Sequence, residues 1–275
     1  MKKIEMTLAT SHIDSHGDML TLNALKSLVT QVNSLVIPLG VEHDPRVAPI
    51  GRVLSARLTQ LDDGHYAVQA DAEVFEVGDK VPLREAGEIP LRSAISDALQ
   101  LSFDRAFLDE ESQLAVNDIA NMFGSPAIRE EKKSLDALAV LTIIGAFTLG
   151  QFASGFLKKL GEDAYQGLKN HLKNLMTRKK ESAEEVLLVF AFCTEFNGHA
   201  IEADVILSNP SPKEIDSFLS NGLTQLDPLL VGALSQNQSI RKLVLSYSED
   251  GLSIAFAVRR DGVPLFPSKA AKGSG

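Results

Sequence analysis

Residues 186–207 read VLLVFAFCTEFNGHAIEADVIL, and this stretch decides the expected fold of the C-terminal part of the chain. Two mostly apolar runs flank the dipeptide Asn197-Gly198. Both residues of that pair tolerate positive φ angles, which the tight turn between two antiparallel strands requires. The stretch therefore predicts a β-hairpin whose turn lies at Asn197-Gly198.

The residues after this hairpin are expected to complete a small ββαββ domain over 185–268. Ser211 is a suitable N-cap for a helix, Pro212 fits its first turn, and Glu214 can close a capping box. Two further apolar runs, 241–247 and 252–258, predict two more strands. The order of elements predicts a small antiparallel sheet with a helix across one face.

A long apolar stretch precedes the hairpin. From Ala137 to Leu157 the sequence has no charged residue, and this length can span a bilayer as a helix. An amphipathic helix is expected to continue from it, so that 131–184 forms one helical segment. The alternatives for the apolar part are a helix buried between two domains, a helix shared in an oligomer, and membrane association.

Composition limits the expected functions. The formal net charge is -9, which argues against nucleic-acid binding because that function needs a basic face. The single cysteine, Cys193, excludes an intrachain disulfide and a CxxC zinc site. The N-terminus lacks the apolar core of a secretory signal, so a cytoplasmic location is expected. Residues 269–275 are expected to form a disordered tail.

The N-terminal part is expected to be a β-rich domain over 1–130. Short apolar stretches alternate with turn signals, and 4–9, 51–58 and 66–75 are typical of strands. Residues 61–64, LDDG, predict the turn of a hairpin. Thr21 is a suitable N-cap for a helix that runs to about Ser34.

Four short motifs follow one another along this part of the chain. They are DSHGD at 14–18, His43-Asp44-Pro45, PIGRV at 49–53 and Leu101-Ser102-Phe103. In order and spacing, residues 5–108 resemble the capsid-maturation (prohead) serine proteases of tailed phages, distant relatives of the herpesvirus assemblins. The resemblance implies an assemblin-like β domain, membership of an oligomeric assembly, and a protein or peptide substrate. The fold class expected for the whole chain is α+β.

The same resemblance implies a catalytic pair. His43 would be the general base and Ser102 the nucleophile, since a serine hydroxyl attacks a carbonyl only when an imidazole takes its proton. The family orients its histidine with a glutamate from a later segment. Asp118 is the acidic residue of the corresponding stretch here, and Asp44 is a second candidate.

Two other functions fit the sequence. The first is a catalytically inactive, protease-like scaffold that binds a partner or forms a homo-oligomer at a membrane. The second is a metal-dependent hydrolase, because His12, Asp14, His16 and Asp18 alternate along the chain and could bind a cation with His43. For the serine peptidase no cofactor and no metal are expected.

Overall fold

The computed structural model describes residues 1–13, 19–41, 44–76, 81–84, 87–92, 98–129, 138–183 and 185–267. The protein is mixed α+β with two sheets. The chain divides into two compact units. Unit 1 comprises Met1–Pro90 and Val258–Leu265, and unit 2 comprises Leu91–Ala257 and the segment from Phe266. The boundaries expected at 130 and 184 both fall inside unit 2.

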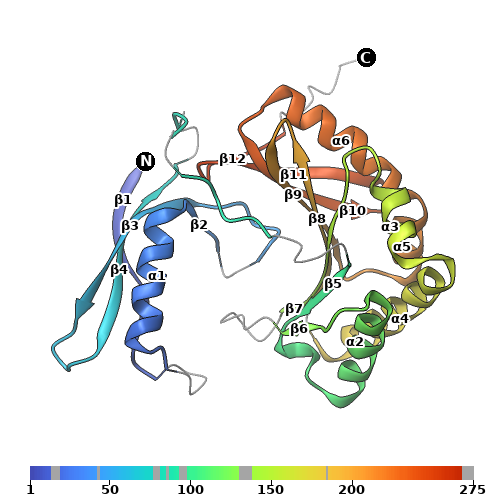
Figure 1. Cartoon of the computed structure of the whole chain (residues 1–275), viewed down its shortest axis with the longest axis horizontal. Coiled ribbons are helices and arrows are strands. Elements are labelled where there is room, and N and C mark those ends of the chain that lie inside the picture. The colour runs from blue at the N-terminus through green and yellow to red at the C-terminus, as the bar shows by residue number, and fades with distance from the viewer. Residues whose placement is uncertain are drawn as a thin grey trace. The chain divides into compact units, whose positions relative to one another are not determined.

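Unit 1 is built on a four-stranded antiparallel sheet with strand order β1-β4-β3-β2. One helix lies along this sheet (Figure 1). Its residues Leu25 and Val32 are buried in one cluster with Val53 and Val68 of the sheet. The elements are β1 (Lys2–Thr10), α1 (Leu22–Ser34), β2 (Ile37–Leu39), β3 (Gly51–Gln60) and β4 (Tyr66–Val74).

The local predictions for unit 1 are confirmed. The Thr21 side chain caps α1 by accepting a hydrogen bond from the Ala24 backbone N–H at 3.2 Å. A hydrogen bond of 2.8 Å from the Leu61 N–H to the His65 carbonyl closes the β3–β4 turn. Gly64 in this turn has φ +85°, a conformation that glycine adopts without a steric penalty.

The larger sheet is mixed, with strand order β12-β11-β10-β9-β8-β7-β5-β6. β5 is antiparallel to β7 and β8 is antiparallel to β9, whereas β5–β6, β7–β8 and β9–β10 are parallel pairs. The strands are β5 (Gln100–Phe103), β6 (Ile128–Arg129), β7 (Leu138–Ala146), β8 (Glu185–Phe196), β9 (His199–Ser208), β10 (Ile240–Ser248), β11 (Gly251–Arg259) and β12 (Pro264–Leu265). The end of β11 and all of β12 group with unit 1.

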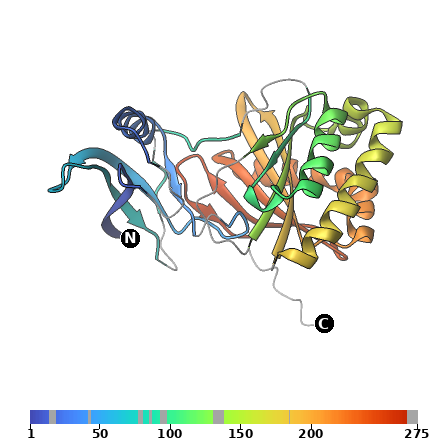
Figure 2. The same ribbon diagram turned by 90° about the horizontal axis from the view of Figure 1, so that it is seen from below.

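The helices of unit 2 lie together on one face of this sheet (Figures 1 and 2). Aromatic side chains form the core between the two layers: Phe190 of β8 contacts Phe218 with ring centroids 4.8 Å apart, and Phe192 contacts Phe152 at 5.4 Å. The helices are α2 (Glu110–Phe123), α3 (Phe152–Leu160), α4 (Glu162–Ser182), α5 (Pro212–Ser217) and α6 (Leu223–Gln236).

The prediction of one long apolar helix was wrong. The first part of that stretch is the strand β7, whose residues Ala139–Ile144 are all buried between β5 and β8. A strand covered on both faces has no polar alternation, so by hydropathy it looks like a buried helix. Only the last part is helical, in α3, and α4 follows after a break at Gly161. No helix within the described ranges is long and apolar enough to cross a membrane.

The strands and the helix start predicted for the C-terminal part are confirmed, but the prediction of a small separate antiparallel sheet was wrong. The hairpin turn has φ +51° at Asn197 and +75° at Gly198, and the capping box between Ser211 and Glu214 is present. However, the four strands do not form a small separate domain, because β8 also pairs with β7. The sheet is also not purely antiparallel. The helices between β9 and β10 form a crossover connection, so β10 pairs with β9 in the parallel direction.

Candidate functional site

Ser102 lies in β5 and is 2 % exposed. Its neighbour Leu101 pairs with Ile143, which in turn pairs with Phe190 of the helix-covered face. Because successive side chains of a strand point to opposite faces, Ser102 points away from the helices. Its hydroxyl has no hydrogen-bond partner in the part of the chain that the structure describes.

The structure does not bring Asp118 to Ser102. Asp118 lies on α2, in the helix layer, with 59 % of its side chain exposed. It lies near His171 of α4, whose Nδ1 is 3.9 Å from Asp118 Oδ2. The sheet therefore separates the predicted nucleophile from the predicted third catalytic residue.

The remaining predicted residues belong to unit 1. His43, Asp14, His16 and Asp18 lie outside the described residues. Asp44 accepts hydrogen bonds from the backbone and the guanidinium of Arg46, both at 2.9 Å, which is a local turn interaction.

His12 lies near two residues that the sequence interpretation did not group with it. Its Nε2 lies 2.7 Å from Asp63 Oδ2, and its ring contacts the His65 ring.

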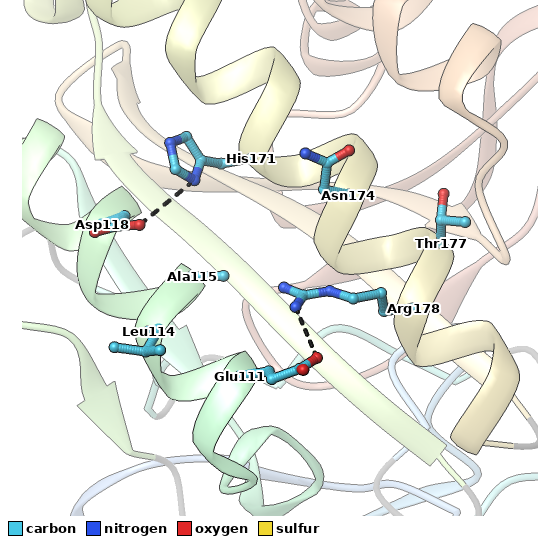
Figure 3. A pocket seen from close by; sticks show the side chains of 8 residues that line it. All are labelled: Glu111, Leu114, Ala115, Asp118, His171, Asn174, Thr177 and Arg178. Carbon is cyan, nitrogen blue, oxygen red and sulfur yellow. Dashed lines mark hydrogen bonds and ion pairs between the residues drawn. The ribbon is translucent and has the colours of Figure 1, made fainter.

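A groove of about 580 Å³ runs between α2 and α4 (Figure 3). The two helices contact each other at Gly167, where an added Cβ would lie 3.0 Å from the methyl carbon of Met122. The groove is lined by Glu111, Leu114, Ala115 and Asp118 from α2 and by His171, Asn174, Thr177 and Arg178 from α4.

The two walls of the groove carry opposite charges. Figure 3 shows two contacts across it: the ion pair of Glu111 with Arg178 at 3.0 Å, and the Asp118 carboxylate with the His171 imidazole at 3.9 Å. The α2 wall is acidic and the α4 wall is basic. The residue numbers rise along one helix and fall along the other, so the helices are antiparallel.

The groove does not have the geometry of a nucleophilic active site. The hydroxyl that lines it, that of Thr177, lies six residues from His171 on the same helix. Six residues span about 9 Å along a helix axis, which is beyond hydrogen-bond reach. The arrangement is instead that of a polar binding surface to which Leu114 and Ala115 contribute apolar side chains.

One end of the groove is held by Asp109, the N-cap of α2. Asp109 accepts a hydrogen bond from the Ser112 N–H at 2.9 Å and is paired with the ammonium of Lys179. Burial alone would raise the pKa of Asp109, but the hydrogen bonds from Lys179 and Ser112 outweigh it and lower the pKa to about 2. This pair joins the start of α2 to the end of α4.

A second charged cluster lies on the sheet face opposite the helices. Asp204 and Glu202 of β9 each pair with Lys242 of β10, at 2.7 and 2.6 Å. The guanidinium of Arg92 lies 2.9 Å from Asp204 and 3.1 Å from Glu202. Two acids and two bases balance one another, as the low dielectric of a buried site requires. The cluster is separated from Ser102 by three strand spacings, about 14 Å.

No protein-family model, curated protein or solved structure matches this chain. The resemblance to prohead proteases thus stays a prediction from the motifs.

Proposed function

We propose that the protein is a non-catalytic scaffold that self-associates through the groove between α2 and α4. The observation that carries this proposal is the charge pattern of the groove, acidic on one wall and basic on the other, around an exposed apolar residue. Leu114, which lines the groove from α2, is 61 % exposed. A second copy of the chain presents the complementary pattern.

Two-fold symmetry makes this surface complementary to itself. A two-fold axis parallel to the groove would place α2 of one copy against α4 of the other, with residues at the same height facing each other. Glu111 of each copy would then face Arg178 of the other, and Asp118 would face His171. Leu114 of each copy would be covered by the other copy, as the apolar residues of an interface are.

Light scattering after size exclusion, over a range of protein concentrations, tests the proposal. We expect the wild type to approach a dimer as concentration rises and Leu114→Asp to remain monomeric, because it replaces an apolar interface side chain by a third carboxylate on the wall of Glu111 and Asp118. The matched control is Leu157→Asp, a substitution of another exposed helical leucine of unit 2, at 43 % exposure. This control should dimerise like the wild type.

A wild type that stays monomeric at every concentration would contradict the proposal. So would a Leu114→Asp variant that dimerises as strongly as the control. Both variants should be shown by circular dichroism to be folded, since both replaced side chains are exposed. High salt should weaken the dimer, because the facing charges are at the surface.

A serine hydrolase is the second candidate, with Ser102 as nucleophile and His43 as base. The observation that favours it is the buried hydroxyl of Ser102 without a hydrogen-bond partner among the described residues. Such a group costs about 1–3 kcal/mol, and a functional role is one reason to retain it. Labelling by a serine-reactive phosphonate that disappears in Ser102→Ala and in His43→Ala would support this candidate. No labelling of the wild type would eliminate it.

A further inference from the structure

We infer that unit 1 carries a binding site for a divalent transition-metal ion, formed by His12, Asp63 and His65. His12 follows the end of β1, and the other two residues lie in the turn between β3 and β4. One potential ligand atom from each residue lies within 4.8 Å of the other two. Pairing of β1 with β4 thus brings together residues that are about fifty positions apart in sequence.

His65 is oriented as metal-binding histidines usually are. Its Nδ1 lies 3.2 Å from the backbone carbonyl of Ser11 and 3.1 Å from the Ser11 hydroxyl. A carbonyl oxygen can only accept, so the tautomer that satisfies this contact carries its proton on Nδ1 and leaves the lone pair on Nε2. The Ser11 hydroxyl is itself fixed by the Tyr66 N–H, at 2.9 Å. A hydrogen bond of this kind sets the tautomer and the ring orientation in metal sites.

Asp63 is held in a similar way. One of its oxygens, Oδ1, accepts a hydrogen bond from the His65 backbone N–H at 3.0 Å. The other, Oδ2, faces His12 Nε2. An aspartate carboxylate is ordinarily charged at neutral pH, so Asp63 offers an anionic oxygen to a cation.

The donor set indicates the class of metal. Two imidazole nitrogens and one carboxylate oxygen suit Zn²⁺, Co²⁺ and Ni²⁺, whereas Mg²⁺ and Ca²⁺ prefer oxygen ligands alone. Tetrahedral Zn²⁺ places its ligand atoms about 3.3 Å apart, given bonds of about 2.0–2.1 Å. The three side chains must therefore close slightly around the ion. They are exposed or half-exposed and can rotate, and at least one coordination position would remain for water.

This site differs from the one expected from the sequence. The HxDxHxD stretch shares only His12 with it, and the other two ligands come from the β3–β4 turn. The two assignments make different predictions for His16 and His65, and that difference decides the experiment.

The test is calorimetric titration of the full chain, free of any polyhistidine tag, with Zn²⁺ at pH 7.5. Co²⁺ titration followed by visible absorption reports the coordination. We expect one ion per chain. His12→Ala and His65→Ala should each weaken binding by about 100-fold or more, since each removes one of only three protein ligands. His199→Ala, at an exposed histidine of unit 2, and His16→Ala should bind as the wild type does.

A stability measurement accompanies the titration. Zn²⁺ should raise the Tm of the wild type and of His199→Ala, but not that of His65→Ala, because only an ion bound to the native state stabilises it. Absence of saturable Zn²⁺ binding, or wild-type affinity in both His12→Ala and His65→Ala, would overturn the proposal. Loss of binding in His16→Ala with full affinity in His65→Ala would overturn it as well and assign the ion to the HxDxHxD stretch.

Discussion

The carboxylate of Asp204 lies 2.7 Å from the ammonium of Lys242, on the neighbouring parallel strand. Asp204 is fully buried, and Lys242 keeps 24 % of its side chain exposed. Burial alone would raise the pKa of Asp204, but the positive charges of Lys242 and Arg92 outweigh it and lower the pKa to about 2. The pair therefore stays ionised at neutral pH and contributes to the stability of unit 2.

Removing the ammonium should destabilise the protein strongly. In Lys242→Met two buried carboxylates lose a partner, and we expect the free energy of unfolding to fall by on the order of 3 kcal/mol. Urea denaturation followed by circular dichroism measures this change. Lys180→Met, at an exposed lysine of α4, is the control and should change stability by less than about 0.5 kcal/mol. Equal stability of the two variants would contradict this interpretation of the cluster.

Lowering the pH should remove the stabilisation that the Asp204 carboxylate provides. The pKa of Asp204 is about 2 in the folded state against an ordinary value of 3.8, so the unfolded chain binds the proton first as pH falls. The stability from Asp204 is thus fully present above about pH 4 and is lost as pH falls towards 2, by on the order of 2 kcal/mol. Asp204→Asn should show a flatter pH dependence in that window. Parallel curves for the two proteins would rule out this contribution.

Asp109 should have two separable roles. Asp109→Asn keeps an oxygen that can cap α2 but removes the charge beside Lys179, whereas Asp109→Ala removes both. We expect Asp109→Ala to be less stable than Asp109→Asn by about 1 kcal/mol, the usual value of an N-cap. Thermal unfolding of both variants measures the difference. If they had the same Tm, the capping role would be refuted.

Ser102→Ala should cost little stability. The hydroxyl it removes is buried and has no partner among the described residues, so we expect a change below about 1 kcal/mol, or a small gain. Asp104→Ala is the contrasting variant, because Asp104 accepts a hydrogen bond from the buried Val140 N–H at 2.7 Å. It should cost about 1–3 kcal/mol. A large loss in Ser102→Ala would mean that the hydroxyl has a structural partner.

Local signals in the sequence were reliable, whereas the pairing of strands was not readable from them. Thr21, Asn197-Gly198 and the Ser211–Glu214 capping box act through neighbours a few residues away, and all three are confirmed. β7 was missed because a strand buried on both faces shows no alternation. The membership of β5 in the larger sheet depends on its pairing with β7, about forty residues later, which no local signal indicates.

The same contrast between local signals and long-range contacts holds for the candidate functional residues. Glu202 and Asp204 alternate within an apolar strand, and two carboxylates on one buried face require basic partners, so this cluster had a readable signal. The contact of His12 with Asp63 and His65 had none, since it depends on the register of β1 and β4. Nor could the sequence place Asp118 beside His171, because that requires the packing of α2 on α4.

Self-association through the α2–α4 groove is tested most directly by charge reversal and mixing. Glu111→Lys and Arg178→Glu each set like charges against each other across the two-fold interface, and mixing the two variants restores opposite charges there. Sedimentation equilibrium should find each variant alone at the chain mass of 29.7 kDa and the equimolar mixture approaching twice that mass. A mixture that remains monomeric while the wild type dimerises, or single variants that dimerise like the wild type, would contradict the proposed interface.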